Sequence, residues 1–72
     1  MERRETMAKY GVRFETADGT LEDAFHVTTR KADAIRTARY AAKTTACTDI
    51  VRVWVDNLCT ELGVASFNTR FA

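Results

Sequence analysis

The residues that could perform covalent chemistry are few in this chain: one histidine, one serine and two cysteines. A serine nucleophile would need His26 and Ser66 to converge beside a carboxylate, and neither residue stands in a motif typical of such a triad. A thiolate nucleophile from Cys47 or Cys59 would need a base or a positive charge beside it. The sequence therefore predicts no catalytic residues, and thiols that are inert and buried or half-buried.

Metal and nucleotide sites are not indicated either. Zinc usually takes four converging ligands, often in close pairs, whereas 11 residues separate Cys47 from Cys59. We expect both cysteines to be reduced rather than joined in a disulfide. The three glycines stand apart and form neither a phosphate loop nor a dinucleotide fingerprint. The prediction is a protein without metal, cofactor or enzyme activity.

A basic stripe is the first candidate binding surface. Residues 30–46 are alanine-rich with helical spacing, and Arg36, Arg39 and Lys43 fall on the side opposite the alanines, flanked by Tyr40. Such a stripe could neutralise phosphates or meet an acidic patch on a protein. A solvated helix face is the plain alternative.

The surface around Trp54 is the second candidate. Trp54, Arg52 and Ile50 alternate along an expected strand at residues 49–56, and we place Arg13 and His26 on the same open side of the sheet. A tryptophan beside an arginine is typical of an interface anchor. Alternatively, the N-terminal segment or residues 57–61 fold over Trp54 and make it part of the structure.

A hairpin should come first among the elements that position these side chains. Alternating apolar residues predict a strand from Tyr10 and a second one from Leu21 to Val27. Between them, Asp18 and Gly19 predict a type I′ turn, which needs positive φ at both central positions. This turn would pair Val12 with Phe25 and Tyr10 with Val27.

The helix should follow, capped at its start by Thr28 or Thr29. Its inward face carries Ala34, Ala38 and Ala42, and Ile35 is its expected apolar anchor. In the strand at residues 49–56, Val51, Val53 and Val55 should face the helix. Residues 57–61 form a turn or one helical turn ended by Gly63 in the left-handed conformation, before a last strand at residues 62–68.

This order of elements predicts an α+β fold, ββαββ. The helix must return the chain to the end of the sheet where the second strand began, so the third strand can pair with the first. The expected sheet has four antiparallel strands in the order 2-1-3-4, with one helix on one face. Residues 1–8 are expected to be flexible, and residues 9–72 to form a single domain.

Composition narrows the function classes. The formal net charge of +1 excludes both a strongly basic tail and an acidic mimic of DNA. The charged start resembles no signal peptide, and no apolar run is long enough for a membrane helix, so we expect a soluble, cytoplasmic protein. A thin core and an open sheet face favour a homodimer, or reserve that face for a foreign partner.

The spacing of residues 29–67 resembles small accessory proteins of phages and mobile elements, and is similar to some type I anti-CRISPR inhibitors. The residues that carry the resemblance are Thr29, Ala32, Ile35, Cys47, Val51, Arg52, Val53, Asn57, Ala65 and Phe67. The resemblance implies an antiparallel sheet with one helix, and a protein that occludes a nucleoprotein effector such as a CRISPR surveillance complex. The leading hypothesis is thus a non-enzymatic protein-interaction module. The alternative is a small nucleic-acid-binding protein that uses the basic helix face.

Overall fold

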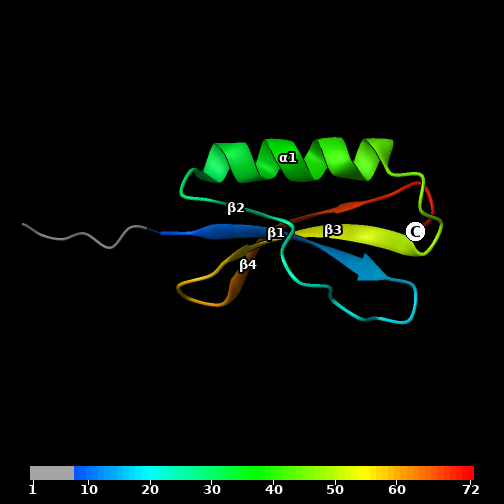
Figure 1. Ribbon diagram of the computed structural model, residues 1–72, viewed down its shortest axis with the longest axis horizontal. Helices are drawn as coiled ribbons and strands as arrows, with labels where there is room; N and C mark the ends of the chain where they lie inside the picture. The colour runs from blue at the N-terminus through cyan, green and yellow to red at the C-terminus, as the bar shows by residue number, and fades with distance from the viewer. Residues whose placement is uncertain (1–7) are drawn as a thin grey trace, which may run out of the picture.

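The computed structural model describes residues 8–72, in which one helix packs on one face of a four-stranded sheet (Figure 1). The elements are β1 (Tyr10–Thr16), β2 (His26–Thr28), α1 (Lys31–Thr44), β3 (Ile50–Asn57) and β4 (Leu62–Asn68). The strands pair antiparallel in the order β2-β1-β3-β4. The predicted fold class, topology and strand order are confirmed. Apart from Ala8, the segment expected to be flexible lies outside the described residues.

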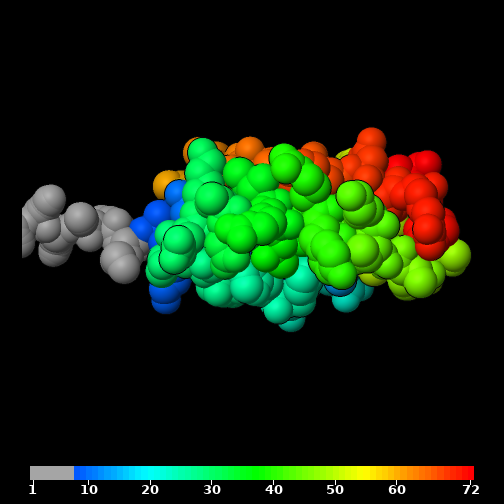
Figure 2. Space-filling model, turned by 90° about the horizontal axis from the view of Figure 1, so that it is seen from above, coloured from blue at the N-terminus to red at the C-terminus, as the bar shows by residue number. Residues whose placement is uncertain are grey.

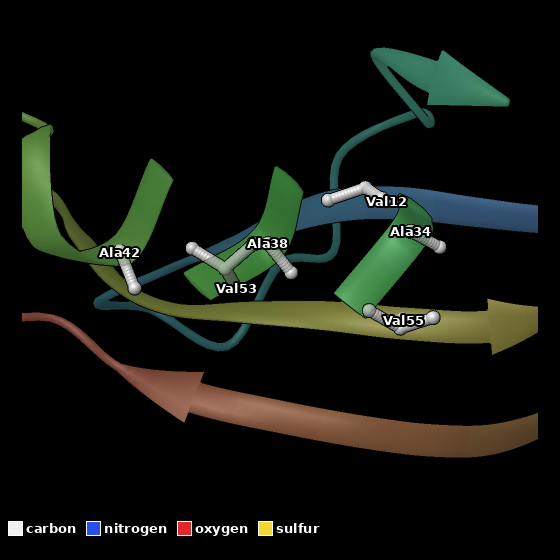
Figure 3. Close-up of a cluster of buried hydrophobic side chains, with 6 residues drawn as sticks. All are labelled: Val12, Ala34, Ala38, Ala42, Val53 and Val55. Carbon is white, nitrogen blue, oxygen red and sulfur yellow. The ribbon is translucent and has the colours of Figure 1, made fainter. Parts of the chain in front are cut away.

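The core lies between α1 and the middle of the sheet (Figure 3). Its buried members are Ala34, Ala38 and Ala42 from the helix, and Val12, Val53 and Val55 from the two central strands. Alanines at every fourth position form one stripe of α1, and their small side chains let the helix sit close to the valines. Ile35 lies beside this stripe and is only half-buried, so its predicted role as the main anchor was wrong.

The start of α1 also differs from the prediction. The N-cap residue is Arg30, and its side chain makes no capping hydrogen bond. Thr28, expected as a cap, accepts a hydrogen bond at Oγ1 from the backbone N–H of Arg30 (3.1 Å) and so braces the turn before the helix. Asp33 in the first turn of α1 is the acidic residue that the helix dipole favours there.

The turn after β1 is not of type I′. Among the described residues other than glycine, only Glu61 has a positive φ, so Asp18 cannot meet the requirement of that turn. Instead, the N–H of Gly19 donates to Thr16 O and that of Thr16 to Thr20 O, both at 2.9 Å. The loop therefore has three residues, with Gly19 at φ 90° in the position that needs a glycine.

The register of the first hairpin is shifted, because the chain inserts two extra residues between Leu21 and His26 beyond the pairing that the loop sets. Val12 lies opposite His26, where Phe25 was expected, and the regular part of β2 is limited to three residues. Leu21 forms an isolated bridge with Glu15, and the chain between Leu21 and His26 leaves the ladder. A one-residue shift sends each side chain to the opposite face of the sheet.

The loop between β3 and β4 is a turn braced by Asn57. Its Oδ1 accepts hydrogen bonds from the backbone N–H groups of Cys59 (2.9 Å) and Thr60 (3.2 Å). The left-handed residue is Glu61, at φ 62°, rather than Gly63 as predicted. The last strand begins and ends where the sequence placed it, whereas β3 is displaced by one residue at each end.

Candidate interaction surfaces

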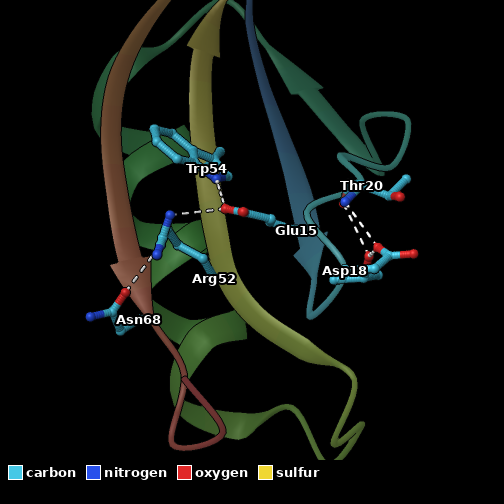
Figure 4. Close-up of polar contacts among 7 residues, drawn as sticks. Glu15, Asp18, Thr20, Arg52, Trp54 and Asn68 are labelled. Carbon is cyan, nitrogen blue, oxygen red and sulfur yellow. Dashed lines mark hydrogen bonds and ion pairs between the residues drawn. The ribbon is translucent and has the colours of Figure 1, made fainter.

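The sheet face away from α1 carries a connected polar network (Figure 4). Glu15 Oε1 accepts hydrogen bonds from Trp54 Nε1 at 2.7 Å and from Arg52 Nη1 at 3.0 Å. Arg52 Nε donates to Asn68 Oδ1 at 3.2 Å, and the guanidinium carbon lies 5.6 Å from the centre of the Trp54 ring. The indole is half-buried; Glu15 belongs to β1, whereas Arg52 lies on the same strand as Trp54 and is tied to β4 through Asn68.

Arg13 and Asp56 form a second ion pair on the same face, with Arg13 Nε 3.2 Å from Asp56 Oδ2. The buried Nε–H is not aimed at the carboxylate and has no other hydrogen-bond acceptor in the described structure. Beside the pair the face is hollowed into an open depression of about 540 Å³, which also touches Trp54, Leu58 and Gly63. The loop after β3 thus borders Trp54 without closing over it.

Two residues predicted for this face lie elsewhere. His26 pairs with Val12, which belongs to the core, and its Nε2 lies 3.1 Å from Asp33 Oδ2 on the helix. The placement of His26 beside Trp54 was therefore wrong, and the register shift is the reason. Ile50 pairs with Thr16 beyond an irregularity in the ladder, so simple alternation from Trp54 does not place it on that face.

The contact between His26 and Asp33 ties β2 to the first turn of α1. A hydrogen bond from the imidazole lowers the pKa of the Asp33 carboxyl below its ordinary value of 3.8, and one from the Thr28 side chain lowers it further. Both side chains remain about a third exposed, at 36% and 37%. The pair thus marks the flank of α1 that faces β2.

The basic stripe on α1 is present as predicted. Arg36, Arg39, Tyr40 and Lys43 are exposed and border one shallow depression of about 170 Å³ on the helix. Tyr40 has 68% of its surface exposed, more than any other large apolar side chain in residues 8–72. The guanidinium carbon of Arg39 lies 5.4 Å from the centre of the Phe67 ring, so this side chain leans from α1 toward β4.

The charges of this stripe form no ion pair with any carboxylate in residues 8–72. The ion pairs formed among residues 8–72 are Arg13–Asp56, His26–Asp33 and Arg52–Glu15. None of them includes Arg36, Arg39 or Lys43. The outer surface of α1 therefore presents three positive charges without an ion pair in the described structure. Besides the hydrogen bond from His26, the nearby charge of Arg36 lowers the pKa of the Asp33 carboxyl.

The nucleophile candidates do not come together. His26 faces α1, whereas Ser66 pairs with Trp54 across the sheet. Cys47 and Cys59 are both exposed, not buried as expected, and no disulfide joins them. Within residues 8–72, no three histidine, cysteine or acidic side chains cluster in a way that could hold a metal ion.

Two contacts that the structure shows were not predicted from the sequence. Glu15 is the hub of the open-face network, and its pairing with residues 37 and 39 positions away could not be foreseen without the register of β1 on β3. Phe25 stacks on Phe14 with ring centres 4.5 Å apart, which keeps a partly exposed aromatic side chain against the edge of the core. The alternation of Tyr10, Val12 and Phe14 in the sequence did indicate that Phe14 lies on the core side of its strand, where Phe25 contacts it.

No protein-family model matches this chain, and neither the curated proteins nor the solved structures contain a significant match to it. In the part of the chain that the structure describes, no helix has the length and apolar character needed to cross a membrane.

Proposed function

We propose that this chain is a non-enzymatic interaction module that binds an acidic surface of a partner protein through the outer face of α1. The observation that carries the proposal is the set of positive charges at Arg36, Arg39 and Lys43, which form no ion pair within residues 8–72, beside the exposed Tyr40. Cations held on one rigid helix face without an ion pair gain from meeting carboxylates, and a tyrosine adds contact area at little entropic cost. The structural core beneath them consists of small alanines, which hold the helix close to the sheet.

The biological role that we propose is that of a phage-type accessory or inhibitory protein acting in the cytoplasm of a host cell. Such a protein would dock on a protein subunit of a nucleoprotein effector and prevent target DNA from entering. This proposal is supported by the pattern resemblance of residues 29–67 to small anti-CRISPR inhibitors and by the near-neutral charge, which does not suit a DNA mimic.

Nucleic-acid binding is the competing function, because the same three cations could contact phosphates. Three such contacts would make the logarithm of the duplex affinity fall with the logarithm of salt concentration with a slope of about −2.7. Polarisation titrations with labelled duplex DNA, single-stranded DNA and poly-L-glutamate at low salt separate the two functions. We expect saturable binding to poly-L-glutamate that exceeds binding to either DNA. Tighter binding to DNA with that salt slope would replace the proposed function by the competing one.

The inhibitory role is tested with a purified type I surveillance complex and its target duplex. Preincubation with the chain should reduce the fraction of duplex bound, and adding the chain after the duplex should have little effect, because the proposed mode is occlusion. Unchanged duplex binding at saturating concentrations of the chain would contradict this role for that effector.

A further inference from the structure

β4 forms one edge of the sheet, and its outer side is unpaired in the described structure. The N–H of Thr69 donates to Val51 O on β3, at 3.0 Å. Because backbone groups of an antiparallel strand alternate in direction, those of Phe67 also face β3, and those of Ser66 and Asn68 point away from the sheet. These outward N–H and C=O groups are available to an additional strand.

The second half of this edge lacks the features that usually protect an exposed strand. β4 has seven residues without a charge or a proline, whereas the opposite edge strand, β2, has only three residues. Natural sheets block their edges with short strands, charged residues, prolines or bulges. The irregularity opposite Val55 and Asp56 disturbs the first half of β4 and leaves residues 65–68 as its regular part.

The helix flank above this edge is basic. Viewed onto α1, the orange and red side chains of the C-terminal segment run along one flank of the green helix (Figure 2). Arg39 reaches that flank, because it lies over the Phe67 ring. Arg36 and Lys43 stand three residues before and four residues after it on α1, and therefore follow the same side of the helix. Between Leu62 and Ala72 the chain has no acidic residue.

A second copy of this chain fits the edge poorly. If two β4 strands paired about a two-fold axis, both helices would lie on the same face of the joined sheet. The basic flanks of the two copies, each with Arg36, Arg39 and Lys43, would then face each other across the junction. Like charges in that arrangement repel, so charge complementarity favours an acidic partner over self-association.

We propose that the outer edge of β4 binds an extended acidic segment of a partner protein as a fifth strand of the sheet. Backbone hydrogen bonds to Ser66 and Asn68 hold the segment, and its carboxylates on the helix side meet the basic flank at Arg39. This inference rests on the proposed function, since it specifies the shape of the acidic partner that α1 recognises.

The test uses a short peptide of alternating threonine and glutamate, titrated against the whole chain by fluorescence polarisation. Ser66→Pro removes an outward N–H without removing a bond to β3, and proline is tolerated at such edge positions. Ser66→Thr is the matched control that keeps the N–H, and circular dichroism verifies the fold of both variants. We expect Ser66→Pro to weaken the affinity about tenfold and Ser66→Thr to leave it unchanged.

Two modified peptides test the backbone donors of the peptide itself. One is N-methylated at its threonines, and the other is N-methylated at its glutamates. At least one of them should lose affinity about tenfold, because methylation removes the donors that face β4. Arg39→Ala tests the charge contribution separately and should also weaken binding of the unmodified peptide. A peptide of alternating threonine and lysine should not bind.

The outcomes separate this inference from the proposed function. If Arg39→Ala weakens binding while Ser66→Pro and both methylated peptides bind as tightly as their parents, strand addition is overturned and the basic-face function stands. If the glutamate peptide shows no saturable binding, or Arg39→Ala has no effect on it, both the inference and the function beneath it are overturned.

Discussion

The two outer faces of the molecule, the open sheet face and the outer face of α1, differ in whether their charged side chains form ion pairs. On the open sheet face, Arg52 and Arg13 are each paired with a carboxylate from a neighbouring strand, and the Trp54 N–H has an acceptor in Glu15. On the outer face of α1, the cations have no acidic partner in the described structure. Internal pairing reduces what a charge gains from an external partner, so this difference supports the proposal that the sheet face serves mainly stability and the helix face serves binding.

The largest expected effect tests which side of α1 faces outward. Ala38 is fully buried against the sheet, so Ala38→Leu should overpack the interface and lower the free energy of unfolding by about 1 to 3 kcal/mol. Arg36→Ala, on the exposed side, should change it by less than about 0.5 kcal/mol. Urea denaturation followed by circular dichroism measures both. Equal tolerance at the two positions would mean that the helix is oriented the other way round.

The next effect tests whether the sheet-face network is structural. Glu15→Ala removes the acceptor shared by Trp54 Nε1 and Arg52 Nη1, which are then left with water alone. We expect a loss of about 1 to 2 kcal/mol in the free energy of unfolding and a red shift of Trp54 emission. Asn68→Ala, which removes only the outer member of the network, is the milder control. If Trp54 emission and the free energy of unfolding are both unchanged in Glu15→Ala, the hydrogen bonds of Glu15 do not contribute to stability, which would contradict the structural role of the network.

A smaller effect on stability is expected from the packing around Gly11 and Gly63 on the open sheet face. A Cβ on Gly11 would lie 3.0 Å from Leu58 Cδ2 and 3.2 Å from Ala24 Cβ, whereas one on Gly63 would meet Trp54 at 3.8 Å. Gly11→Ala should therefore destabilise by about 1 kcal/mol, and Gly63→Ala should not. Thermal denaturation of the two variants makes the comparison. A larger loss from Gly63→Ala would contradict the described packing of the loop after β3.

The smallest effect is the pH dependence at the β2 flank of α1. Because the folded pKa of Asp33 lies below 3.8, its carboxylate stabilises the fold above that pH, and this contribution is lost as the pH falls through the folded pKa. Asp33→Asn should lower Tm at neutral pH, and the difference from the wild-type chain should shrink in acid. A difference in Tm that is independent of pH would contradict the role of the charged carboxylate.

The elements were predictable because each has a strong local pattern. Val51, Val53 and Val55 recur at every second position, and Ala34, Ala38 and Ala42 recur at helical spacing, so the strand, the helix and their contact followed from the sequence. The order of the strands then followed from chain reversal and crossover rules. For the strands, the helix and the strand order, the local sequence pattern and the overall fold require the same structure.

The details of the candidate surfaces were less predictable because they depend on register. The three-residue loop at Gly19 and the two extra residues between Leu21 and His26 together place His26 on the helix side, whereas a two-residue turn would put it on the open face. The partner of Trp54 Nε1 lies 39 positions away, and only the pairing of β1 with β3 brings it close. The basic stripe needed no such information, since its residues share one helix.

The most direct test of the account is a comparison of two triple variants with equal net charge. The first replaces Arg36, Arg39 and Lys43 on α1 by alanine, and the second replaces the exposed Lys9, Arg30 and Lys31. Affinity for poly-L-glutamate at low salt is measured for both and for the wild-type chain. We expect the first variant to lose saturable binding and the second to keep most of it. Equal losses would show that net charge alone drives binding, and would contradict the assignment of a binding surface to α1.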